Sequence, residues 1–134
     1  ADIVVMAAAV TDFRAKNPKP HKVKKSEPDA CVVRLVRNPD ILAELGVRKK
    51  RGQILVGFSA ETKDLRRHAL QKLRHKNLDC IVANKVGGRN SAFESRDNKV
   101  MVLRREEKPL AFSRRDKGSL ALQLTRLFLK LVPR

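Results

Sequence analysis

The chain has 134 residues, 42% of them apolar, which suits one globular domain with a modest core and excludes a long disordered polymer. Its 31 Lys and Arg residues against 14 Asp and Glu give a formal charge of +17, so we expect the protein to attract anions. With no Trp or Tyr and only five Phe, the chain has little from which to build a base-stacking platform for nucleic acid. A small phosphorylated ligand fits the charge equally well.

The two cysteines, Cys31 and Cys80, each lie in an apolar run, where cysteine usually behaves as a small buried hydrophobe. Neither a disulfide framework nor a zinc site is indicated. The first needs more cysteines in an oxidising compartment, and the second needs a tighter Cys/His cluster than this chain offers. No signal peptide is visible, and no apolar run reaches the roughly 20 residues that cross a bilayer. We therefore expect a protein of the reducing cytoplasm.

The first predicted element is a strand in the apolar run from Ile3 to Val10, which begins without a polar lead-in and is typical of a strand buried on both faces. Because such a strand needs neighbours, we expect the N-terminal part of the domain to be absent from this sequence. Residues 12–29 then predict a long mobile loop, since Pro18, Pro20 and Pro28 exclude regular structure over most of it.

A second strand is predicted from Cys31 to Val36. It leads into a short helix that Asn38 caps, Pro39 opens and Gly46 closes.

Further along, the buried strand 54–60, a helix at 64–77 and a strand from Cys80 alternate along the chain. This order indicates the α/β class, with a Rossmann-like, mostly parallel sheet and flanking helices. A late strand is expected at 99–104, paired with a segment from Leu110. The last helix, about 117–132, carries one apolar stripe that should pack on the sheet, formed by Leu120, Leu124, Leu127, Phe128 and Leu131.

The helix at 64–77 has an unusual distribution of charge. Leu65, Ala69 and Leu73 span an arc of about 80°, and Lys72 and Lys76 fall at or inside the edge of that arc. The other charges on this helix take the opposite side. Two lysines on a core-facing stripe are costly unless an anion meets them or their stems extend out at its rim, and both alternatives stay open.

The basic run HKVKK, from His21 to Lys25, lies in the predicted loop. Most lysine clusters on loops are simply solvated. This one follows the carboxyl end of a buried strand, which is where open α/β sheets bind ligands. The alternative reading is therefore a lid that brings ammonium groups onto a bound phosphate.

Three further positions are weaker candidates. Asp12 follows the same strand end, and Asp40 lies at a predicted helix start whose free N–H groups favour anions, although both also suit a plain cap or surface carboxylate. Phe58 is more simply a core residue than a stacking surface. The chain has no GxGxxG or Walker-type loop, and its three histidines show no metal-ligand spacing.

Seven segments in chain order resemble the phosphopantothenoylcysteine synthetase (phosphopantothenate–cysteine ligase) family, the second activity of the bacterial bifunctional coenzyme A biosynthesis flavoprotein. They are AAAVTDFR from Ala7, KVKK from Lys22, NPDIL from Asn38, VGFSAET from Val56, KNLD from Lys76, IVAN from Ile81 and FESRDNKV from Phe93.

The resemblance implies a ligase that joins 4′-phosphopantothenate to cysteine through an acyl-cytidylate, using CTP with Mg²⁺, and that forms a homodimer. It implies that Lys22, on the mobile lid, acts in catalysis by stabilising charge on the phosphates or the acyl-cytidylate. It places no metal ligand. The nucleotide-binding residues that it implies are Met6, Ala7, Ala8, Asp12, Lys22, Pro39, Asp40, Ile41, Leu42, Phe58, Lys72 and Lys76.

Residues 1–134 are accordingly expected to form the C-terminal, CTP-binding portion of such a ligase domain. The family's phosphopantothenate-binding segments have no match here, so full activity is not expected from this chain alone. The flavin-dependent phosphopantothenoylcysteine decarboxylase domain often fused upstream has no match either, and FMN is not implied. Residues 130–134 are also compatible with a tag remnant. The competing hypothesis is a basic, non-enzymatic nucleic-acid-binding domain, suggested by the charge.

Overall fold

The computed structural model describes residues 1–22, 32–86 and 97–133, which belong to two compact units. Unit 1 comprises Ala1–Ala7 and Ile41–Arg134, and unit 2 comprises Ala8–Asp40. Unit 2 is thus an insertion in the sequence of unit 1.

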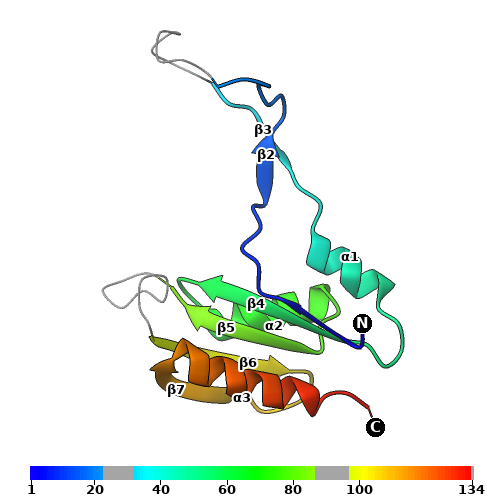
Figure 1. The fold of residues 1–134 in the computed structure, drawn as a ribbon, viewed down its shortest axis with the longest axis vertical. Coiled ribbons are helices and arrows are strands. Elements are labelled where there is room, and N and C mark those ends of the chain that lie inside the picture. Colours follow the sequence, from blue (N-terminus) through cyan, green and yellow to red (C-terminus); the bar gives the residue numbers. More distant parts are fainter. Residues whose placement is uncertain (23–31, 87–96, 134) are drawn as a thin grey trace. The chain divides into compact units, whose positions relative to one another are not determined.

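Unit 1 is built on a five-stranded sheet (Figure 1). Its strands, in spatial order, are β1 (Ile3–Met6), β4 (Ile54–Glu61), β5 (Cys80–Lys85), β6 (Asp97–Arg104) and β7 (Leu110–Asp116). Strands β1, β4 and β5 pair in parallel, and β6 is antiparallel to both of its neighbours. Only β6 therefore runs against the common direction, and the predicted mostly parallel α/β sheet is confirmed.

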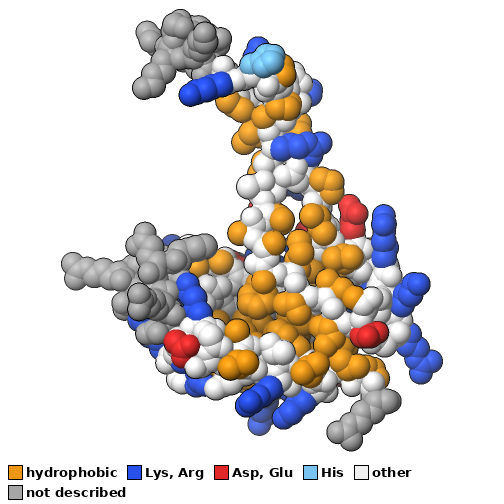
Figure 2. Space-filling view, in the orientation of Figure 1, with side chains coloured by type: hydrophobic (Ala, Val, Ile, Leu, Met, Phe, Trp, Pro, Cys, Tyr) orange, Lys and Arg blue, Asp and Glu red, His pale blue; other side chains and the backbone are white. Residues whose placement is uncertain are grey.

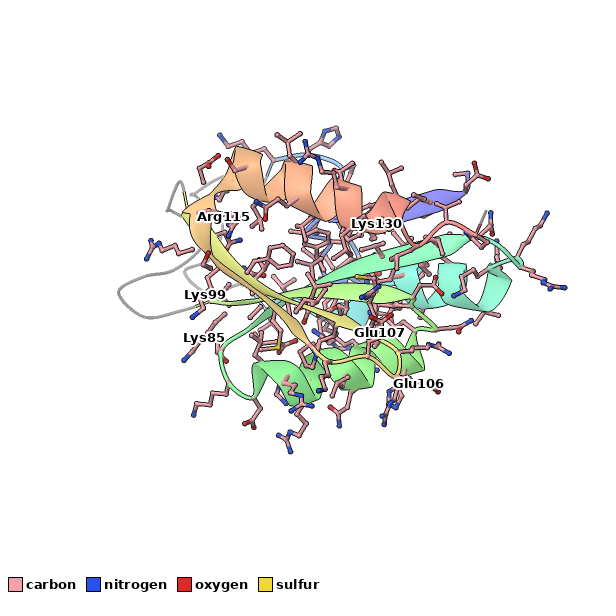
Figure 3. The ribbon with its side chains drawn as sticks, turned by 90° about the horizontal axis from the view of Figure 1, so that it is seen from below. Lys85, Lys99, Glu106, Glu107, Arg115 and Lys130 are labelled. Carbon is pink, nitrogen blue, oxygen red and sulfur yellow. The ribbon has the colours of Figure 1, made fainter. Side chains whose placement is uncertain are left out.

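Helices cover both faces of this sheet, as Figure 3 shows for α2 and α3. Helices α1 (Ile41–Arg48) and α2 (Leu65–His75) pack on one face, and α3 (Lys117–Leu129) packs on the other. Because side chains alternate along each strand, β4 contributes Ile54 and Val56 to the α3 side and Leu55 to the α2 side. The predicted stripe on the last helix is confirmed, since Leu120, Leu124 and Phe128 are buried in the α3-side core.

Helix α1 comes unusually close to the sheet and to the end of α2. A Cβ atom on Gly57 of β4 would lie 2.9 Å from Cδ2 of Leu42, and one on Gly46 would lie 1.9 Å from the carbonyl oxygen of Lys76. The prediction that Gly46 closes the helix is wrong, because α1 continues to Arg48. Gly46 serves the close approach of two backbones instead.

A half-buried ion pair joins the loop after α1 to the start of β5. The Nζ atom of Lys49 lies 2.8 Å from Oδ1 of Asp79, and the backbone N–H of Leu55 donates to Oδ2 of the same carboxylate over 2.7 Å. Asp79 therefore connects β4 to the chain that enters β5.

Cys80 lies in the core, with none of its surface exposed. The predicted small buried hydrophobe is thus confirmed, and burial raises the pKa of the thiol to about 12. Cys31 lies outside the described residues. Among the helices that the structure describes, none combines the length and the apolar character needed to cross a membrane.

Strand β1 corrects the first prediction in two ways. It ends at Met6 although the apolar run continues to Val10, and its residues are half-buried or exposed rather than buried on both faces. Val5 alone is 45% exposed. The physical reason is that, within the described chain, β1 pairs only with β4 and lies at the edge of the sheet. Figure 2 shows hydrophobic side chains gathered on the surface of unit 1.

Unit 2 contains an antiparallel pair of short strands, β2 (Phe13–Ala15) and β3 (Leu35–Arg37). The predicted loop at 12–29 is therefore wrong at its beginning, and the strand predicted from Cys31 to Val36 begins only at Leu35. Asn38 does not cap a helix through its amide, because its Nδ2 donates to the carbonyl oxygen of Thr11 over 2.8 Å. Its Oδ1 accepts from Arg14 of β2 over 3.0 Å.

Candidate anion-binding site

The carboxyl end of β4 carries a cluster of polar side chains on the face that α2 covers. Ser59 and Glu61 alternate along the strand and so point to the same side. Lys72 of α2 reaches both of them, with Nζ 2.7 Å from Oε1 of Glu61 and 3.2 Å from Oγ of Ser59. The Ser59 hydroxyl donates to the same Glu61 oxygen over 2.5 Å, and Nδ1 of His68 lies 3.3 Å from Oε2.

The cluster keeps Glu61 ionised. Burial alone raises the pKa of this carboxyl group, but hydrogen bonds from Lys72 and Ser59, the charge of Lys72 and a hydrogen bond with His68 outweigh burial, so the net pKa lies below the ordinary value. Its side chain is only 13% exposed, whereas that of Lys72 is 44% exposed. The carboxylate is thus largely shielded from solvent, whereas nearly half of the Lys72 side chain remains accessible.

A cavity of about 420 Å³ opens beside this cluster. Its walls combine the carboxylate with cationic, titratable and amide side chains, namely Glu61, His68, Gln71, Lys72, His75 and Lys76. Two lysines and two histidines on one wall of such a cavity suit a ligand that carries several negative charges.

Basic residues also lie at this end of the sheet in the neighbouring strands. Lys85 of β5 is in register with Glu61. Figure 3 shows Lys85, Lys99 and Arg115 at one end of the sheet, and Glu106, Glu107 and Lys130 toward the other. Several cations therefore lie where β4 and β5 end, the edge at which open α/β sheets bind ligands.

Lys76 follows the last residue of α2, one turn beyond Lys72, and its backbone N–H donates to the Lys72 carbonyl oxygen over 3.0 Å. Both lysines are half-buried, whereas Arg66, Arg67 and Arg74 are exposed. The helical phase predicted from the sequence is confirmed. The next residue, Asn77, fixes this end of the helix by donating from Nδ2 to the Gly46 carbonyl oxygen over 2.8 Å and accepting from Arg105 over 2.6 Å.

The other predicted residues of unit 1 lie around the ends of β1 and β4. Met6 is in register with Gly57, and Ala7 follows it directly. Ile41 and Leu42 form the first turn of α1, and Leu42 packs toward Gly57.

Phe58 differs from these residues. It is 38% exposed, so the prediction of a core residue is wrong. Alternation places it on the opposite face of β4 from Ser59 and Glu61. A ligand that contacts both Phe58 and Lys72 must therefore extend around the end of the strand.

The remaining predicted residues belong to unit 2 and are described within it. Asp12 and Lys22 have exposed side chains, and the Asp12 carbonyl oxygen accepts from the N–H of Asn38 over 2.9 Å. Ala8 accepts from the N–H of Val10 over 3.1 Å. Pro39 and Asp40 end the unit, just before α1. The rest of the KVKK segment, residues 23–25, lies outside the described residues.

Sequence reasoning missed Ser59, Glu61 and His68 as members of the site. The available signal was the two-residue alternation of polar side chains at the end of an otherwise apolar strand, on the face toward Lys72. For a metal, no group of three or more His, Cys, Asp or Glu residues suited to hold one exists within the described ranges. A Mg²⁺ site built from three or more such side chains therefore does not fit the residues of those ranges.

Comparison with known proteins adds independent information. The family model for the C-terminal domain of DNA/pantothenate metabolism flavoproteins matches residues 1–131. The bifunctional coenzyme A biosynthesis protein CoaBC of Bacillus subtilis (strain 168) is 47% identical over 102 residues, which are 76% of this chain and 25% of that protein. A cysteine/cysteine sulfinic acid decarboxylase from an unknown prokaryotic organism is 37% identical over 131 residues, 98% of this chain and 36% of that one.

Among solved structures, the C-terminal domain of a CoaBC protein superimposes with a TM-score of 0.69 at 30% identity, covering 97% of this chain and 55% of that chain. The chain thus spans about a quarter to a third of the two curated relatives and about half of the solved domain. The family model, the identities and the fold agree with the ordered motifs of the sequence. The chain belongs to the family of DNA/pantothenate metabolism flavoprotein C-terminal domains, the phosphopantothenoylcysteine synthetase part of bacterial CoaBC.

Proposed function

We propose that this chain forms the nucleotide-binding portion of a CTP-dependent phosphopantothenate–cysteine ligase in coenzyme A biosynthesis. Family membership supports the assignment to coenzyme A biosynthesis, and the polar cluster at the end of β4 supports the binding of a nucleotide there. The observation that carries the proposal is the pair Lys72 and Lys76 on one wall of a cavity of about 420 Å³ at that edge.

In this proposal the two lysines hold the triphosphate of CTP. The carboxylate of 4′-phosphopantothenate attacks the α-phosphorus of CTP, an acyl-cytidylate forms and pyrophosphate leaves. The cysteine amine then attacks the acyl carbon, the amide bond forms and CMP leaves. Cations fixed beside the β- and γ-phosphates accelerate the first step because they stabilise the charge that develops on departing pyrophosphate. Mg²⁺ would neutralise further phosphate charge when it enters with the nucleotide.

Lys22 is proposed to act from the lid, adding a cation to the phosphates or to the acyl-cytidylate after the nucleotide has bound. Its exposed side chain in unit 2 is consistent with such a role. The proposal also includes further parts of the protein that would bind phosphopantothenate, and a homodimeric arrangement. It includes a partner decarboxylase domain as well, which the bifunctional relatives support.

The test is a calorimetric titration of the chain with CTP and, separately, with a single-stranded oligonucleotide, at about 150 mM salt. We expect CTP to bind, and Lys72→Met or Lys76→Met to weaken it roughly tenfold or more, as the loss of a charge-assisted hydrogen bond predicts. Arg66→Met is the matched control, because Arg66 is an exposed cation of the same helix. Tight, steeply salt-dependent oligonucleotide binding without CTP binding would favour the nucleic-acid-binding hypothesis.

A further inference from the structure

Lys72 is restrained by two partners from β4. An ammonium group has three N–H donors, and here one is directed to Glu61 over 2.7 Å and another to Ser59 over 3.2 Å. Ser59, only 3% exposed, closes the triangle by donating to the same Glu61 oxygen over 2.5 Å. The third donor of Lys72 is left for a group in the cavity that Lys72 lines.

A carboxylate is an unexpected neighbour for a phosphate site. Glu61 also lines the cavity, and its negative charge repels an incoming anion. If the cavity needed only positive charge, a neutral residue at this position would serve better. What compensates for this repulsion is that the carboxylate holds the lysine in one position. A free lysine side chain samples many rotamers, and it must lose that freedom when it binds a phosphate.

The two partners of Lys72, Ser59 and Glu61, are themselves held in place by the sheet. Ser59 and Glu61 lie on β4, which is hydrogen-bonded to β1 and β5, and α2 is fixed to this sheet through the buried Ala69 and Leu73. His68, one turn before Lys72, lies 3.3 Å from the second carboxylate oxygen and restricts rotation of the Glu61 side chain. The position of the Lys72 ammonium is thus set by the sheet rather than by its own flexible stem.

We propose that Glu61 is a positioning residue for Lys72, which it holds, together with Ser59, in the geometry that binds a polyphosphate. The proposal rests on the proposed nucleotide-binding function and adds a residue that acts through the lysine. Glu61 repels the phosphate, but this cost is offset because Lys72 is already restrained and loses less rotamer entropy when the phosphate binds.

Two substitutions separate geometry from charge. Glu61→Asp keeps the negative charge but withdraws the carboxylate by one methylene, and Glu61→Gln keeps the length and an acceptor oxygen but removes the charge. We expect Glu61→Asp to weaken binding of inorganic triphosphate and of CTP about three- to tenfold, as the immobilisation of one long side chain predicts. Glu61→Gln should bind both at least as tightly as the unchanged chain.

A double-mutant cycle tests whether the effect passes through Lys72. In a Lys72→Met background, Glu61→Asp should change the Kd for triphosphate less than twofold, because no ammonium remains to be positioned. Glu106→Asp is the matched control, since it makes the same shortening in an exposed turn toward the other end of the sheet (Figure 3). Ser59→Ala is a charge-neutral second variant and should weaken triphosphate binding about two- to threefold, even if Glu61→Asp fails to fold.

The outcomes are distinct. An unchanged Kd for triphosphate in both Glu61→Asp and Ser59→Ala overturns the positioning role. So does an equal loss of affinity on Glu61→Asp with and without Lys72. Either result leaves a simple structural contact between β4 and α2. If the unchanged chain binds neither CTP nor triphosphate, the proposed function fails together with this inference. If it binds both and only the Glu61 predictions fail, the inference alone is lost. Thermal unfolding of each variant confirms that folded protein is compared.

Discussion

The backbone of Gly46 in α1 lies against the carbonyl group of Lys76 at the end of α2, so closely that a methyl group on Gly46 would lie 1.9 Å from that oxygen. The Gly46 carbonyl oxygen in turn accepts from Asn77 over 2.8 Å. The end of α1 and the residue that follows α2 are therefore held together backbone to backbone. This contact sets the position of Lys76 on the wall of the cavity.

Gly46→Ala is expected to lower the free energy of unfolding by about 2 kcal/mol or more, because the added methyl group must push the two backbones apart. It should also weaken triphosphate binding by displacing Lys76. Urea denaturation measures the first effect and calorimetry the second. Glu44→Ala, an exposed position on the same helix, should change stability by less than about 0.5 kcal/mol. Equal stability of Gly46→Ala and the unchanged chain would contradict the close packing.

Asp79→Ala is expected to cost about 2 kcal/mol of stability. It leaves the N–H of Leu55 without its carboxylate acceptor and removes the ion-pair partner of Lys49, whose side chain is only 15% exposed. Chemical denaturation measures the loss. Arg67→Ala, which breaks an ion pair with Asp64 between side chains that are both more than half exposed, should cost less than about 1 kcal/mol. Similar costs for the two variants would show that the Asp79 network is no stronger than a surface pair.

The stability contributed by ionised Glu61 should depend on pH. Because its pKa in the folded state lies below the ordinary value of 4.5, this contribution is fully present above about pH 4.5 and is lost as the pH falls through the folded pKa. The difference in Tm between the unchanged chain and Glu61→Gln should therefore be largest near neutral pH and shrink in acid. A difference that stays constant down to strongly acid pH would contradict the ion pair with Lys72.

Cys80 should be unreactive in the folded protein, because burial raises its pKa to about 12 and leaves no surface exposed. In a Cys31→Ser variant, iodoacetamide at mildly alkaline pH should label the chain only after denaturant is added. Mass spectrometry gives the extent of labelling. Rapid labelling of the folded variant would show that the α3-side core opens far more often than its packing implies.

The parts of the fold that could be predicted from sequence depend on local patterns. The predicted strand 54–60 and the strand from Cys80 are mostly apolar runs, and the helix between them has a clear apolar stripe. Lys72 and Lys76 could be assigned to the inner edge of that helix because helical phase needs no knowledge of the partner element. The family could be identified because its motifs keep their order along the chain.

What could not be predicted depends on pairing between distant residues. Strands β2 and β3 have three residues each, and Phe13 and Leu35 remain about half exposed. Strand β2 lies in the stretch that predicts a loop, and only Leu35 and Val36 of β3 fall inside the strand predicted from Cys31 to Val36. Gly46 reads as a helix stop because glycine weakens a helix, and only the approach of Lys76 explains its place inside α1. The Glu61–Lys72 contact likewise depends on how β4 and α2 pack.

Strand β1 pairs with β4 only after the intervening chain, which includes all of unit 2 and α1, has closed a long loop, since Ile3 is in register with Ile54. That closure carries an entropic cost. Within the described ranges, the pairing of four β1 residues with β4, on one side of the strand, is what offsets it. Amide hydrogens in β1 should consequently exchange with solvent sooner than those of the central strand β5. Met6 and Ala7, at the edge where anions are expected, would thus detach in a local opening that leaves the rest of the sheet folded.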